Sequence, residues 1–285
     1  MLLVVNPISG GLDKAEFIEA VAHFATKENW NLILFKTSGE DDVSKISLLF
    51  RQHKPKRIII VGGDGTLKMV AEATEKKGVI LGILPAGSAN GLAVDLGLMK
   101  TLEENIEIAF NTKYIELDTI VINDQKCFHL SDLGLNAELV KNYEKSKVRG
   151  KWGYFLQILN TLIDLGEPFQ AVITTEDAII ECEARMIVIA NSKKYGTGIV
   201  INPDGVMNDG KFEVVILKKL DLMIFGEIIT GNMPLNPQEI EILSVNKATI
   251  TTNFPVSFQI DGEYCGVETQ LDVKISPYKI KVAIP

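Results

Sequence analysis

A short glycine-rich segment is the first place in this sequence where residue types and spacing could do chemistry. It consists of Gly62, Gly63, Asp64, Gly65 and Thr66, and it separates the apolar run 58–61 from the helix-favouring run 67–73. Glycines let the backbone approach a phosphate closely, and the start of a helix adds unpaired N–H groups with a favourable dipole. The segment therefore predicts a site for nucleotide phosphates between a strand and a helix.

The carboxylate of Asp64 lies in the middle of this predicted anion site. A phosphate would repel it unless the carboxylate meets Mg²⁺, a ribose hydroxyl or a proton donor. An ordinary strand-to-helix turn is the simpler interpretation of paired glycines, but the aspartate favours a catalytic one. The segment matches neither the P-loop pattern nor GxGxxG, so P-loop NTPases and dinucleotide dehydrogenases are not favoured.

The elements that must position this segment alternate between short apolar runs and amphipathic stretches, at residues 2–5, 15–26, 32–35, 43–50, 57–61, 67–75 and 79–84. This alternation is typical of a parallel sheet with helices on both faces. Ligands of such sheets bind beyond the carboxyl ends of the strands. Those ends carry Asn6, Thr37, Gly62 and Pro85, so four loops are expected to converge.

From about residue 114 the pattern changes to closely spaced β-type runs, at 114–121, 169–174, 185–190, 212–217, 248–252 and 256–260. Three turn sequences, Asn123-Asp124, Asn208-Asp209-Gly210 and Asp261-Gly262, favour antiparallel pairing. Helices are expected near 151–165 and 220–230. We therefore predict an α/β protein of two domains. Residues 1–115 with about 278–285 form a doubly wound nucleotide-binding domain, and residues 116–277 form a β-rich sandwich.

Composition restricts the partners. The 285 residues include 29 basic and 37 acidic side chains, and the net charge of −8 opposes nonspecific binding to nucleic acid. The three cysteines are far apart, which favours a reducing cytoplasm over a disulfide framework or a zinc site. The first residues predict a buried strand rather than a signal peptide, and no apolar stretch is long enough to span a bilayer.

Four motifs in order resemble the diacylglycerol kinase catalytic family, which includes bacterial soluble diacylglycerol kinases, YegS-like lipid kinases and sphingosine kinases. They are NPISG from Asn6, GGDGT from Gly62, LPAGSAN from Leu84 and DGE from Asp261. The resemblance implies the two-domain fold shared by NAD kinases and diacylglycerol kinases. It also implies ATP and Mg²⁺ as cofactors and a lipid hydroxyl, of diacylglycerol or a sphingoid-type lipid, as the phosphate acceptor.

The same resemblance implies roles for individual residues. Asp64 would be catalytic, and Glu263 would be the general base. Asp209 would bind Mg²⁺ together with the backbone oxygens of Val206 and Lys211, and Asp118 would belong to a water network around that metal. The nucleotide site would comprise Asn6, Pro7, Ser9, Gly10, Thr37, Gly62, Gly63, Asp64, Gly65, Thr66, Ser88 and Asn90.

Without the resemblance, simpler interpretations apply to the acidic residues of the second domain. Asn208-Asp209-Gly210 would be a hairpin turn, Asp118 a carboxylate at a strand end, and Glu263 a hairpin-tip residue in water. Two other functions also stay open. One is an NAD kinase, which shares GGDGT, although its usual Asn-Glu motif is not evident here. The other is a catalytically silent lipid- or nucleotide-binding regulator.

The acceptor is left open by a departure from the family. Many bacterial diacylglycerol kinases continue the third motif as GTxNDFAR, whereas Gly91 and Leu92 follow Asn90 here. This form is more similar to that of sphingosine kinases.

A basic run near the middle of the chain predicts contact with a membrane surface. Its cations are followed by aromatic residues, as expected for a segment that meets anionic headgroups, although a solvated loop leading into a buried helix would have the same composition. We expect a cytoplasmic protein that reaches the inner membrane face peripherally, with a dimer compatible with the sequence. The residues are Lys141, Lys145, Lys147, Arg149, Lys151, Trp152, Tyr154 and Phe155.

Overall fold

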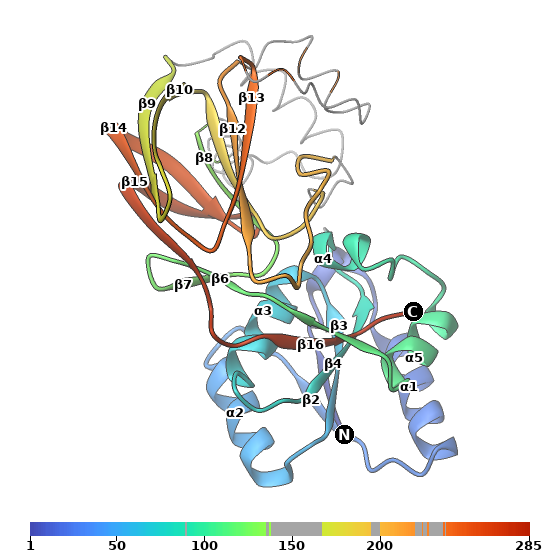
Figure 1. Cartoon of the computed structure of the whole chain (residues 1–285). Coiled ribbons are helices and arrows are strands. Elements are labelled where there is room, and N and C mark those ends of the chain that lie inside the picture. Colours follow the sequence, from blue (N-terminus) through green and yellow to red (C-terminus); the bar gives the residue numbers. More distant parts are fainter. Residues whose placement is uncertain are drawn as a thin grey trace. The chain divides into compact units, whose positions relative to one another are not determined.

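The computed structural model describes residues 1–88, 90–134, 137, 167–194, 200–219, 224, 227, 236 and 238–285. The chain divides into two compact units (Figure 1). Unit 1 comprises Met1–Leu117 with Pro277–Pro285, and unit 2 comprises Asp118–Ser276. The predicted basic run, the predicted helix near 151–165 and nearly all of the one near 220–230 lie outside the described residues.

Unit 1 is built on a six-stranded sheet in the order β2-β1-β3-β4-β16-β5. The first five strands in this order are parallel, and β5 pairs antiparallel with β16. The last strand of the chain thus belongs to the sheet of the first unit. The strands are β1 (Leu2–Val5), β2 (Ile33–Lys36), β3 (Arg57–Gly62), β4 (Ile80–Pro85), β5 (Tyr114–Leu117) and β16 (Ile280–Ala283).

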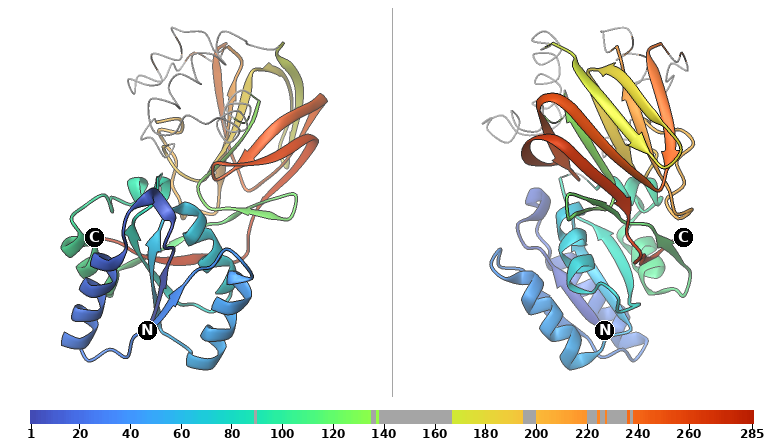
Figure 2. Two further views of the ribbon diagram at one scale, coloured as in Figure 1. Left: turned by 180° about the vertical axis from the view of Figure 1, so that it is seen from behind. Right: turned by 60° about the vertical axis from the view of Figure 1, so that its left-hand side comes forward.

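Helices cover both faces of this sheet, which explains why residues 2–5 of β1 and 58–61 of β3 are buried and apolar at every position. On β1 and β3, Leu3 and Ile59 face a core that also contains Val21 of α1 and Ile106 of α5. Helices α2 and α3 cover the opposite face (Figures 1 and 2). The helices are η1 (Ser9–Gly11), α1 (Ala15–Lys27), α2 (Asp42–His53), α3 (Asp64–Ala73), α4 (Gly91–Asp95) and α5 (Leu102–Phe110).

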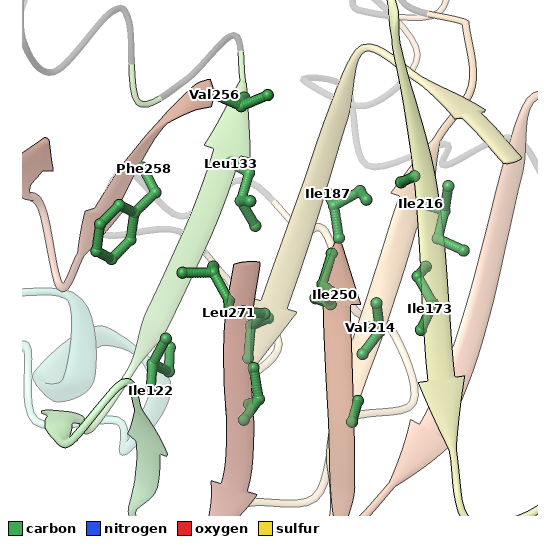
Figure 3. Packing of buried hydrophobic residues seen from close by; sticks show 14 of the residues in the cluster. Ile122, Leu133, Ile173, Ile187, Val214, Ile216, Ile250, Val256, Phe258 and Leu271 are labelled. Atoms are coloured by element: carbon green, nitrogen blue, oxygen red, sulfur yellow. The ribbon is translucent and has the colours of Figure 1, made fainter. Parts of the chain in front are cut away.

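Unit 2 is an antiparallel β-sandwich, in which the long strand β14 pairs with β15, β8 and β9. A register shift between Thr251 and Val256 lets the two ends of β14 join different neighbours. Its core packs side chains such as Leu133, Ile216 and Ile250 between the layers (Figure 3). The strands are β6 (Ile120–Ile122), β7 (Gln125–Cys127), β8 (Leu130–Gly134), β9 (Phe169–Thr175), β10 (Ile179–Ala184), β11 (Met186–Ala190), β12 (Phe212–Leu217), β13 (Ile240–Val245), β14 (Lys247–Ile260) and β15 (Glu263–Ile275).

These sheets confirm the predicted fold class, a parallel α/β domain followed by a β-sandwich. Two of the three predicted turns are two-residue hairpins with positive φ at both positions, Asn123-Asp124 and Asp261-Gly262. The third, at 208–210, lies in a long connection rather than a two-residue turn, but the strands that it joins, β11 and β12, pair antiparallel as predicted.

The prediction of one strand over 114–121 is wrong. The run breaks after Leu117, so that β5 joins the sheet of unit 1 and β6 joins the sandwich of unit 2. The reason is that Asp118 bonds to a loop instead of a strand: its N–H donates to the carbonyl of Met207 (2.8 Å), and its carboxylate accepts from the N–H of Gly210 (2.7 Å). Conversely, the runs 248–252 and 256–260, which were predicted separately, form one bulged strand, β14.

Candidate functional site

The glycine segment lies at the topological switch point of the unit 1 sheet. The chain leaves β1 toward β2 on one side and returns to β3 on the other side of β1. The loops that follow β1 and β3 therefore diverge, and ligands of open α/β sheets bind at this position. The loop after β1 carries Asn6 and Gly10, and the loop after β3 carries Gly63 and Asp64.

Asn6 joins these two loops directly. Its N–H donates to the carbonyl of Val61 (3.0 Å), and its side-chain amide donates to the hydroxyl of Thr66 (3.1 Å). Its side-chain oxygen accepts from the N–H of Ile8 (3.2 Å), which turns the loop after β1. Asn6 and Thr66 thus hold the two predicted phosphate-binding loops together.

Two glycines are required by close approach. A Cβ on Gly62 would lie 2.4 Å from the hydroxyl oxygen of Thr66, so a larger residue would displace that side chain. Gly10 has φ +64°, and a Cβ there would lie 2.7 Å from the carbonyl oxygen of Ala86. The loop after β1 therefore packs on the loop after β4 as well as bonding to the loop after β3.

Asp64 is the first residue of α3, and its carboxylate crosses to the next helix. It accepts hydrogen bonds from the backbone N–H groups of Gly91 (2.7 Å) and Leu92 (3.2 Å) at the start of α4. The proton donor that a carboxylate needs beside an anion site is thus supplied by the protein backbone. Asp64 ties the glycine segment to the loop after β4.

Asn90 shapes that third loop from within. Its side-chain oxygen accepts from the N–H of Gly87 (2.9 Å), and its side-chain nitrogen donates to the carbonyl of Gly87 (3.1 Å). Ser88 lies on the resulting turn and is exposed, as is Pro7 on the loop after β1. Ser9 and Gly10 are half-buried.

Thr37 follows β2 and is buried, with its N–H donating to the carbonyl of Val5 (2.9 Å). The loop after it is held by the buried carboxylate of Asp42, which accepts from the N–H groups of Ser38 (3.0 Å) and Gly39 (2.7 Å). Burial would raise the pKa of Asp42, but the bonds from Ser38 and Gly39 outweigh it and lower that pKa. Sequence reasoning missed this residue because nothing local marks it as buried.

The Asp42→Asn variant is expected to lose about 1.5–3 kcal/mol of unfolding free energy at pH 7, the scale of hydrogen bonds to a charged group. Because folding lowers this pKa, the ionised group stabilises the fold above its unfolded pKa of about 3.9 and stops doing so as pH falls through the folded value. The deficit should therefore shrink below about pH 4. Urea unfolding at pH 7 and below about pH 4 measures this loss of stability. The control is Asp41→Asn, a change at an exposed neighbouring residue. Equal stability of the two variants at pH 7 would contradict the assignment.

A second missed residue, Lys14, lies beneath the loop after β1. It is 4% exposed, and its ammonium donates to the carbonyls of Ser9 (2.6 Å) and Leu12 (2.8 Å). Burial lowers the pKa of Lys14, and the neighbouring charge of Asp13 partly offsets this. A lysine at the start of an amphipathic helix gives no sequence signal of burial. Its ammonium brings a positive charge to the predicted phosphate site.

The Lys14→Met variant is expected to bind ATP roughly tenfold more weakly, because it loses a charge-assisted bond worth about 1.5–3 kcal/mol that holds the loop. Isothermal titration with ATP measures the change. Lys27→Met, at the exposed end of α1, is the matched control. If both variants bind ATP as the unmodified protein does, Lys14 does not shape the site.

In unit 2 the structure brings Asp118 to the predicted metal loop. Asp118 is fully buried and bonds to the N–H of Gly210, next to Asp209. Asp209 is exposed, and one of its carboxylate oxygens accepts from the N–H of Lys211 (3.0 Å). Val206 is also exposed. Residues 195–199, earlier in the same connection, lie outside the described residues.

The donors of this loop are all oxygens, which suits a hard cation such as Mg²⁺. Within the described residues, no group of three or more His, Cys, Asp or Glu side chains is placed to hold a metal. Mg²⁺ usually keeps several waters and takes only one or two carboxylates. Asp209, one exposed carboxylate among backbone oxygens, is a donor of that kind.

Glu263 is the first residue of β15, directly after the Asp261-Gly262 turn, and it is exposed. The turn is fastened to unit 2 through Asp261, whose carboxylate accepts from the N–H groups of Phe128 (3.0 Å) and His129 (2.9 Å). Glu263 therefore lies at the tip of a hairpin whose turn is held by the connection between β7 and β8. The predicted nucleotide residues all lie in unit 1, and the predicted metal residues and general base lie in unit 2.

Among the described helices, none is both long and apolar enough to cross a membrane.

Comparison with known proteins gives the chain a place among them. Residues 1–122 match the family model described as "Diacylglycerol kinase catalytic domain", and residues 132–284 match "YegS C-terminal NAD kinase beta sandwich-like domain". A Staphylococcus aureus (strain MSSA476) protein named "Putative lipid kinase" is 27% identical over 234 residues, which cover 79% of this chain and 76% of that protein.

Solved structures share the fold. The crystal structure of a "putative diacylglycerol kinase" from Bacillus anthracis superposes with a TM-score of 0.81 at 21% identity, over 100% of this chain and 96% of that one. An NAD kinase from Archaeoglobus fulgidus, solved with ATP, gives a TM-score of 0.53 at 12% identity over 99% and 92%. The chain belongs to the family that joins a diacylglycerol kinase catalytic domain to a YegS C-terminal domain.

Proposed function

We propose that this protein is an ATP-dependent lipid kinase that transfers the γ-phosphate of ATP to a lipid hydroxyl. The observation that carries the proposal is the convergence of the loops after β1, β3 and β4 at the switch point of the sheet. Asn6 bonds to Thr66 across two of the loops, and Asp64 bonds to Gly91 and Leu92 across two of them. Family membership supports kinase chemistry at that place.

Phosphoryl transfer requires alignment of the reactants, neutralisation of phosphate charge and a group that accepts the proton of the attacking hydroxyl. In this proposal the backbone N–H groups of the glycine segment and the start of α3 bind the phosphates of ATP. The remaining predicted contacts come from Asn6, Ser9, Gly10 and Ser88. Thr37 closes the site at the loop after β2.

Mg²⁺, when bound, supplies positive charge that neutralises phosphate oxygens. Asp209 with the backbone oxygens of Val206 and Lys211 would hold such an ion, and buried Asp118 would keep their loop in shape. Asp64 organises the nucleotide side by holding α3 and α4 together. Glu263 accepts the proton of the lipid hydroxyl. Glu263 belongs to unit 2, and the phosphate loops belong to unit 1.

The acceptor in this proposal is diacylglycerol or a sphingoid-type lipid, met at the cytoplasmic membrane surface by a protein that binds there transiently. The test is transfer of label from γ-labelled ATP in the presence of Mg²⁺, with three acceptors in parallel: diacylglycerol micelles, sphingoid-base micelles and NAD⁺. Labelled lipid in either micelle is the expected result. Labelled NADP⁺ would replace the proposal with an NAD kinase, and no labelled product would favour a binding regulator.

A further inference from the structure

A fully buried carboxylate lies close to the turn that precedes Glu263. Asp132 is in the middle of β8, between Ser131 and Leu133, and is 0% exposed. A carboxylate in such a place is costly unless hydrogen bonds compensate it. Asp132 accepts one from the side-chain amide of Gln259, which is its direct cross-strand partner on β14.

Gln259 connects Asp132 to the turn. It is 2% exposed, and its side-chain oxygen accepts from the N–H of Gly262 (2.7 Å). Its own backbone carbonyl accepts from the hydroxyl of Ser131. A continuous chain of bonds therefore runs from the buried carboxylate, through one amide side chain, to the N–H of the residue before Glu263.

This series of hydrogen bonds requires an amide side chain at position 259. The side chain must donate to a carboxylate at one atom and accept from an N–H at the other, and a glutamine amide offers both. A glutamate could accept from Gly262 but would place a second carboxylate against Asp132. An apolar side chain could do neither.

The hairpin itself does not need this series of hydrogen bonds in order to form. Asp-Gly is a favoured two-residue turn, and Asp261 and Gly262 have the positive φ values (52° and 85°) that it requires. Asp261 also fastens the turn to Phe128 and His129 on one side. The buried polar chain holds it on the other side, beside a register shift between Phe258 and Gln259 that re-aims the start of β15. Because the turn forms without the buried carboxylate, the cost of burying Asp132 suggests a role in orienting the residue after the turn, Glu263.

We propose that Asp132 and Gln259 are positioning residues that fix the Gly262 peptide and thereby aim Glu263. The inference rests on the proposed function, in which Glu263 is the general base. A misplacement of about 1 Å at a catalytic group can cost roughly 100-fold in rate. Loss of the connection should therefore act on kcat rather than on ATP binding, whose predicted residues lie in unit 1.

The experiment exchanges the carboxylate and the amide between positions 132 and 259. Gln259→Glu alone should lower kcat by roughly 10- to 100-fold with the KM for ATP unchanged. Adding Asp132→Asn should restore kcat to within about threefold of the unmodified protein, because the new amide donates to the new carboxylate, which still accepts from Gly262. Gln270→Glu is the matched control: it makes the same change beside Asp272 on β15, but on the exposed surface.

A second readout does not depend on activity. Amide hydrogen exchange at Gly262, measured by NMR, should accelerate about tenfold or more in Gln259→Glu, since repulsion from Asp132 displaces the new carboxylate from its place beside this N–H. Exchange should slow again in the double variant. Unchanged exchange, or an unchanged kcat in Gln259→Glu, would overturn the inference. If Gln259→Glu does not fold, the double variant still decides, because a kcat more than tenfold low or a failure to fold contradicts the pairing. If the unmodified protein labels no acceptor, the proposed function fails while Gly262 exchange still tests the connection.

Discussion

Replacing Glu263 with glutamine is expected to lower kcat for lipid phosphorylation by roughly 10²- to 10⁴-fold, the usual contribution of a general base. The variant keeps the shape of the side chain and the hairpin that presents it, but it cannot accept the proton of the attacking hydroxyl. ATP affinity should not change, because the predicted phosphate residues belong to unit 1. Steady-state kinetics with the labelled lipid and calorimetric titration with ATP measure the two effects separately.

Glu268→Gln is the control for this experiment. Glu268 lies on the same strand, β15, and is also exposed, so the variant removes one negative charge without touching the turn. It should behave as the unmodified protein does. A Glu263→Gln variant with normal kcat on a verified lipid acceptor would remove Glu263 from the mechanism.

Replacing Asp64 with asparagine is expected to damage both ATP binding and turnover. The carboxylate accepts from the N–H groups of Gly91 and Leu92 with its two oxygens, whereas asparagine has one oxygen and would set its own N–H groups against a donor. Loss of a charge-assisted bond should cost about 1.5–3 kcal/mol, or roughly 10- to 100-fold in ATP affinity. We expect kcat to fall by at least about 100-fold, as when a fixed electrostatic group is removed from an active site.

The two variants should therefore differ in kind. Glu263→Gln lowers kcat alone, while Asp64→Asn also weakens ATP binding and lowers the free energy of unfolding, because it loosens the link between α3 and α4. Asp41→Asn, an exposed change in the same unit, controls for loss of charge. Normal ATP affinity and normal kcat in Asp64→Asn would show that the loops converge without this carboxylate.

Local patterns in the sequence were sufficient for several parts of the fold and the site. The order of apolar strand, glycine segment and helix was predictable because it depends on adjacent residues. Glycines allow close approach of the backbone, and the helix that follows supplies N–H donors at its start. The Asp261-Gly262 hairpin was predictable for the same reason, since its φ values follow from its two residue types. The alternation of apolar and amphipathic runs predicts the parallel sheet, because strands buried on both faces must be apolar throughout.

Partners distant in sequence were decided only by tertiary structure. Asp64 binds N–H groups 27 and 28 residues further on, and Asp132 faces Gln259 across 127 residues, because strand order and register bring them together. The break of the 114–121 run at Asp118 likewise depends on the loop that contains Met207 and Gly210, the latter 92 residues further on. Residue types thus determine which groups can bind a phosphate or take a proton, while packing determines which side chains hold them in place, because each such bond needs a partner that only the folded sheet supplies.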